Sequence, residues 1–127
     1  MKKILSALIA LMLVAGAVYA EQFTALKKTG DMTVKVVIEN DPLKVGNNTA
    51  AIELLDEKGG AITDAEVSVY FFMPSMPAMN YEVPASNSSD GYAAVIKPTM
   101  PGAWEAEINV KLAGGDTHTA TISFDAK

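Results

Sequence analysis

The feature that most constrains the fold is a strict alternation of apolar and polar residues with a period of two. It is clearest at residues 104–111 and 118–124, which are joined by the turn sequence Gly114-Gly115-Asp116. A period of two indicates a β-strand with one buried face, and Gly-Gly between two such runs indicates a hairpin. The alternation places Trp104 at the centre of the expected core. It also gives the last strand an inward face made of His118, Ala120, Ile122 and Phe124.

The same pattern recurs along the chain between Gly-, Pro- and Asn-rich turns. We expect strands at residues 32–39, 49–55, 66–73, 92–97 and, as a short one, 80–84. No stretch after residue 20 has a sustained helical period. Short strands with a turn signal every ~8 to 12 residues predict an all-β fold, an immunoglobulin-like antiparallel β-sandwich of about seven strands. Tyr92, at a strand start, is a candidate tyrosine-corner residue.

Residues 1–20 follow a different pattern. Lys2 and Lys3 precede an uncharged apolar run from residue 4 to residue 18, and Val18-Tyr19-Ala20 has the small-x-small form of a cleavage site. This is the layout of a helical secretory signal peptide. A run of about 15 residues spans only about 22 Å, less than the ~30 Å hydrocarbon core of a bilayer.

We therefore predict three parts: a bacterial signal peptide at 1–20, a polar N-terminal segment at 21–30, and one β-sandwich domain at 31–127. The expected location is the periplasm or the outside of the cell, with no direct membrane insertion after cleavage.

Composition excludes several function classes. The chain has no arginine and no cysteine, and residues 21–127 carry a net charge of −7 (8 lysines minus 15 acidic residues). Nucleic-acid binding and attachment to an anionic membrane surface both need a basic surface. Thiol catalysis, structural disulfides and Cys-ligated zinc all need cysteine. The chain has one histidine, so a site that needs two is also excluded.

Methionine is the one clustered group with distinctive chemistry. Residues 73–79 read Met-Pro-Ser-Met-Pro-Ala-Met and place thioethers at Met73, Met76 and Met79. A spacing of three matches polyproline II, which would align the thioethers on one side. A thioether is a soft, neutral ligand that favours Cu(I) over zinc or calcium. Met100, also followed by Pro, is a possible fourth thioether, and His118 could supply an imidazole.

Each of these residues also has a purely structural interpretation. Met73 lies on the inward face of its strand and would fill the core. Met100 would pack a loop, and His118 would be a core or rim residue. The prolines would protect a sheet edge from aggregation. The whole segment would alternatively serve as a hydrophobic docking loop, or as a sink for oxidants through sulfoxide formation.

Four stretches in sequence order carry a family resemblance. Residues 56–67 hold a Gly turn followed by Asp-Ala-x-Val, and residues 72–79 hold the Met-Pro segment. Residues 90–95 start a strand with Gly-Tyr, and residues 100–104 contain Gly-x-Trp. Over about residues 31–125 the chain resembles the YtkA-like/FixH-like family of small exported β-sandwich domains. The resemblance implies an accessory role in copper handling, including copper-oxidase assembly and metal efflux.

The leading hypothesis is a periplasmic, non-enzymatic, Met-rich copper(I)-binding or copper-handling accessory protein. Its candidate ligands are Met73, Met76, Met79, Met100 and His118, and the expected partner is a membrane-bound copper transport, efflux or oxidase-assembly protein. The alternative is a metal-free structural or interaction module that docks on such a partner through the Met-Pro loop. We expect no enzyme activity because the sequence shows no nucleophile elbow, acid/base pair or cofactor motif.

Overall fold

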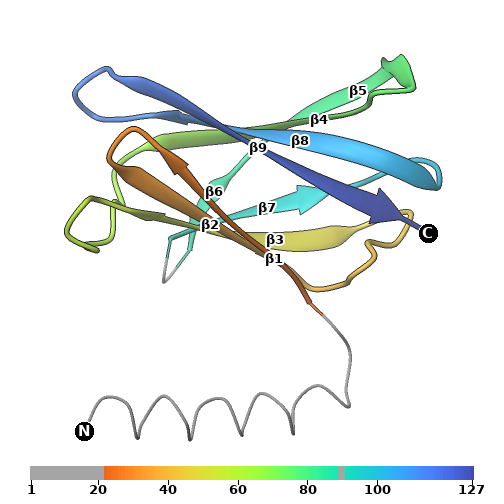
Figure 1. Ribbon diagram of the computed structural model, residues 1–127, viewed down its shortest axis with the longest axis horizontal. Coiled ribbons are helices and arrows are strands. Elements are labelled where there is room, and N and C mark those ends of the chain that lie inside the picture. The colour runs from red at the N-terminus through yellow and green to blue at the C-terminus, as the bar shows by residue number, and fades with distance from the viewer. Residues whose placement is uncertain (1–21, 89–90) are drawn as a thin grey trace, which may run out of the picture.

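Two antiparallel sheets stack face to face in a computed structural model that describes residues 22–88 and 91–127 (Figure 1). The predicted signal peptide lies outside the described residues. The described part contains nine strands: β1 (Phe23–Thr29), β2 (Met32–Ile38), β3 (Asn48–Leu55), β4 (Glu66–Met73), β5 (Met76–Pro84), β6 (Ser86–Ser88), β7 (Gly91–Ile96), β8 (Gly102–Lys111) and β9 (Thr117–Ala126). No helix in this part of the chain is long and apolar enough to cross a membrane.

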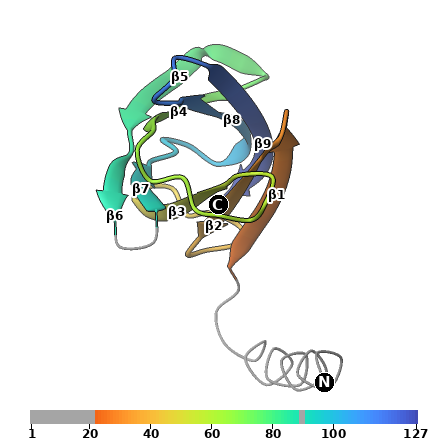
Figure 2. The ribbon, with the colours of Figure 1, turned by 90° about the vertical axis from the view of Figure 1, so that its left-hand side faces the viewer.

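Sheet A has the strand order β1-β2-β3-β7-β6, and sheet B has the order β5-β4-β8-β9. The end view in Figure 2 shows the two layers, and buried side chains from both sheets form one hydrophobic core cluster. The predicted all-β antiparallel sandwich is therefore confirmed. At one side of the sandwich, the rings of Phe23 in β1 and Phe124 in β9 meet edge to face at 6.3 Å and close the gap between the sheets.

The core follows the alternation in the sequence. Every second residue of β2, β4, β8 and most of β9 is buried, and the residues between them face outward. Trp104 is 1% exposed and packs against Phe71 with ring centroids 5.9 Å apart. The predicted central position of Trp104 is thus confirmed, as is the inward face of β9.

The N-terminal segment and the strand count differ from the prediction. Residues 23–29, expected to precede the domain, form β1 and pair with β2 along its full length. Lys27 and Lys28 interrupt the alternation there, so the sequence pattern was too weak to reveal an edge strand. β5 starts at Met76 rather than near residue 80, and β6 is a three-residue strand with only exposed residues. The described residues thus form nine strands, where about seven were expected.

Tyr92 holds the loop between β3 and β4, which connects the two sheets, against the core. Its ring is buried, and its hydroxyl accepts a hydrogen bond from the Ala65 amide (3.0 Å) and donates one to the Ile62 carbonyl (2.9 Å). A tyrosine corner bonds the backbone a few residues upstream. Tyr92 instead bonds the connection between β3 and β4, about 30 residues earlier.

Replacing Tyr92 with Phe should lower the free energy of unfolding by about 1.5 kcal/mol, because a partly buried amide and a partly buried carbonyl both lose their partner. Urea denaturation followed by circular dichroism measures this. The matched control is Tyr70→Phe, whose ring lies on the outer face of sheet B and which should change stability by less than about 0.5 kcal/mol. Equal losses in both variants would contradict a bonding role for the Tyr92 hydroxyl.

Candidate metal site

The Met-Pro segment is a β-hairpin turn. β4 ends at Met73 and β5 begins at Met76, and these two residues face each other across the ladder with Pro74-Ser75 as the turn between them. The predicted polyproline II conformation is therefore wrong. Pairing of the flanking strands sets the backbone here, and the edge position of β5 tolerates a proline that cannot donate to a ladder.

The pairing of β4 with β5 shifts register just after the turn. Phe72 pairs with Asn80 while Met73 pairs with Met76, so Pro77, Ala78 and Met79 have no partner on β4. The Asn80 side chain donates hydrogen bonds to the carbonyls of Pro77 (2.9 Å) and Ala78 (3.4 Å). Bulges redirect side chains next to functional sites, and this shift in register determines where Met79 lies.

Met79 packs against the aromatic end of the core. The Tyr81 hydroxyl donates a hydrogen bond to the Met79 Sδ atom at 3.9 Å and lies 3.1 Å from the Thr99 Oγ1 atom. The Tyr81 ring in turn lies 6.3 Å from the Trp104 ring. Tyr81 therefore links the hairpin of sheet B to the loop that contains Met100.

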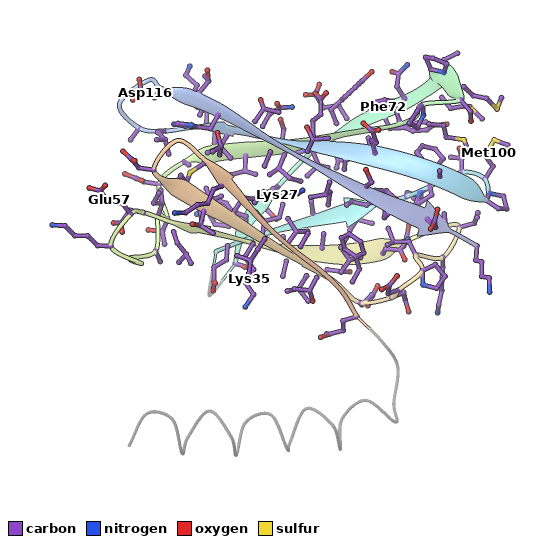
Figure 3. All side chains as sticks on the ribbon, in the orientation of Figure 1. Lys27, Lys35, Glu57, Phe72, Met100 and Asp116 are labelled. Carbon is purple, nitrogen blue, oxygen red and sulfur yellow. The ribbon has the colours of Figure 1, made fainter. Side chains whose placement is uncertain are left out.

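Met100 is held at the same end by the core tryptophan. The Trp104 Nε1–H donates a hydrogen bond to the Met100 carbonyl at 3.0 Å, and the Met100 side chain is half-buried against the core. In Figure 3, most of the sulfur atoms gather at the end of the sandwich where Met100 is labelled. The structure thus brings Met76, Met79 and Met100 to one end of the molecule.

Met73 and Met76 have opposite environments. Met73 is 4% exposed and belongs to the core cluster. Its methyl group lies beneath Gly102, where an added Cβ atom would come within 2.8 Å of it. Met76 is 44% exposed at the start of β5. The burial of Met73 favours the interpretation that this side chain fills the core. Met76, in contrast, is accessible to solvent and to a ligand.

His118 lies at the opposite end of the sandwich. It pairs with Val110, whereas the methionine end of the same ladder begins with Gly102 opposite Ala126. Eight residues of strand separate the two ends, which is about 26 Å. The His118 Nδ1 atom lies 3.3 Å from the Thr29 Oγ1 atom at the β1–β2 turn. His118 therefore cannot complete a site with the methionines. Its position agrees with the interpretation of His118 as a residue at the rim of the core.

At the end of the sandwich that holds Met76, Met79 and Met100, the soft donor atoms are thioether sulfurs. Across residues 22–88 and 91–127 no three His, Cys, Asp or Glu side chains are grouped closely enough to hold a metal. The aromatic wall formed by Tyr81, Trp104 and Phe71 was not predicted as part of the site. The signal for Tyr81 was available in the alternation of Asn80, Tyr81 and Glu82, which places Tyr81 inward.

The fold and this arrangement define a small antiparallel β-sandwich domain with a methionine-rich end. The chain matches the YtkA-like family over residues 26–109 and belongs to that family. No curated protein matches the chain. Among solved structures it resembles the PmoD soluble domain from Methylocystis sp. ATCC 49242 (Rockwell), with 14% sequence identity and a TM-score of 0.56, covering 80% of this chain and 96% of that one. At this identity the likeness concerns the fold.

Proposed function

We propose that this protein is a non-enzymatic accessory module that binds Cu(I) through methionine thioethers and handles it in the bacterial periplasm. The observation that carries the proposal is that three methionines lie at one end of the sandwich: Met79 contacts Tyr81 through its sulfur, Met100 is held by Trp104 through its carbonyl, and the exposed Met76 lies on the adjoining hairpin. Membership of the YtkA-like family and the exported character expected from residues 1–20 support the same role.

The donor set fits Cu(I) better than other metals. Met76, Met79 and Met100 would be the ligands, and all three are neutral, soft and free of any proton that would compete near neutral pH. Hard cations such as calcium and magnesium require oxygen ligands, usually carboxylates. The copper is cargo, so the expected partner is a membrane-bound copper transport, efflux or oxidase-assembly protein that supplies or receives it.

The test is a competition titration of Cu(I) against a chromophoric chelator, under anaerobic reducing conditions, with the protein produced from the full chain. The double variant Met79→Leu/Met100→Leu removes two thioethers but nearly preserves side-chain volume. We expect its Cu(I) affinity to be at least about tenfold lower than that of the original protein, which corresponds to about 1.4 kcal/mol.

Two single variants are matched controls. Met32→Leu removes a buried thioether at the start of β2, next to the β1–β2 turn that His118 contacts, and His118→Ala removes the imidazole at that end. Both should leave Cu(I) affinity within about twofold of the original. Equal affinity in the original and the double variant would refute the proposal. If copper is not retained but a partner is captured only with an intact hairpin, the metal-free docking function is correct instead.

A further inference from the structure

The outer face of sheet B carries two aromatic rings on its central strand β4. Tyr70 and Phe72 alternate with the inward residues of this strand, and both are half-buried. Their ring centroids are 5.5 Å apart with an interplanar angle of 34°. Figure 3 labels Phe72 on this outer side, toward the end of the molecule that holds Met100.

Carboxylates surround these two rings. Tyr70 lies directly between Glu82 of β5 and Glu107 of β8, and Phe72 lies beside Glu105 of β8. Directly opposite residues share a face, with Cβ atoms about 5 Å apart. Tyr70, Phe72, Glu82, Glu105 and Glu107 thus form one continuous surface, which we name the acidic aromatic face.

The negative charge of this face is not balanced within its own sheet. On the far side of Glu105 and Glu107 the next strand places Ser123 and Thr121. Among the residues of the four strands of sheet B, the one lysine is Lys111, which lies at the other end of β8 opposite Glu66. Three carboxylates therefore lie around two aromatic rings with neutral neighbours on either side.

We infer that the acidic aromatic face binds an extended basic segment of a partner protein, with an arginine side chain stacked on the Tyr70–Phe72 pair. Arginine is the cation that stacks on aromatic rings and also pairs with carboxylates through its planar guanidinium. This chain contains no arginine, so another copy of it cannot supply one. The inference concerns partner recognition and does not depend on copper binding.

The test uses a short synthetic peptide of alternating arginine and threonine, titrated into the protein produced from the full chain and followed by NMR. We expect saturable shifts of the Tyr70 and Phe72 resonances that weaken as salt is added. The variant Glu105→Gln/Glu107→Gln should bind about fivefold more weakly, because two charge pairs at the surface are lost. The variant Tyr70→Leu/Phe72→Leu should bind the peptide about threefold more weakly, because it lacks the ring faces on which arginine stacks.

The matched control is Glu57→Gln/Asp116→Asn, which removes the same charge at the other end of the molecule (Figure 3). It should bind the peptide within about twofold of the original, as only the long-range field changes. Equal losses in the two charge variants would overturn the inference, since net charge alone would then explain binding. Equal affinity for a lysine–threonine peptide would overturn the assigned arginine stacking. Thermal unfolding of each variant establishes that it is folded.

Discussion

Replacing Trp104 with Ala should lower the free energy of unfolding by about 4 kcal/mol, the largest effect expected of any single substitution described for this protein. The side chain is 1% exposed and contacts the rings of both Phe71 and Tyr81. Its removal leaves a cavity that the two sheets cannot close, because β8 is paired on both sides. Chemical denaturation followed by far-ultraviolet circular dichroism measures the loss.

The variant Trp104→Phe separates packing from hydrogen bonding. It retains most of the ring but removes the Nε1–H that holds the Met100 carbonyl. We expect a loss of about 1.5 kcal/mol from the smaller ring and the unpaired carbonyl together. A loss below about 2 kcal/mol for Trp104→Ala would contradict a central packing role, because large-to-small changes at a filled core position cost about 3 to 5 kcal/mol.

The second large effect is expected at Asn48, where the substitution Asn48→Leu should lower the free energy of unfolding by about 3 kcal/mol. Asn48 is 0% exposed and is the buried polar residue of the described core. Its side-chain amide donates to the carbonyls of Lys44 (2.7 Å), Gly46 (2.9 Å) and Ile96 (3.2 Å), and its oxygen accepts from the Lys44 amide (3.0 Å). A leucine of similar size removes all four hydrogen bonds, of which the one to the Ile96 carbonyl is buried and the others are partly buried. An unpaired buried group costs about 1 to 3 kcal/mol, and partly buried groups cost less.

Asn47→Leu is the matched control for Asn48. The two asparagines are neighbours in the sequence, but Asn47 is exposed. Its substitution should change the free energy of unfolding by less than about 0.5 kcal/mol in the same denaturation experiment. Similar losses of stability at both positions would contradict the role assigned to the Asn48 hydrogen bonds, because Asn47 does not make them.

These two residues also illustrate how much of the fold could be predicted from the sequence. The period of two identified β2, β4, β8 and β9, and it placed Trp104 in the core, because a strand with one buried face imposes that period directly. Asn48 follows Asn47 in a turn sequence, and nothing local distinguishes the buried amide from the exposed one. Its role depends on Ile96, which is 48 residues away.

The candidate site was predicted in part. The Met-Pro cluster was visible because three methionines fall within seven residues. Its conformation was not, because the shift in pairing between Phe72 and Met73 is a property of two strands together. His118 was a reasonable copper ligand by residue type, because imidazole binds copper. The ladder between β8 and β9 places it at the far end, and no local pattern encodes that distance.

The alternation along β4 has a consequence for how sequences of this family can diverge. Phe71 and Met73 point into the core beside the methionine end, while Tyr70 and Phe72 belong to the acidic aromatic face. Even-numbered and odd-numbered positions of one strand therefore serve different surfaces. Substitutions at the outer positions therefore change the acidic aromatic face without changing the packing beneath the hairpin. Under the two proposals made above, partner recognition and copper binding would be separable within these eight consecutive residues.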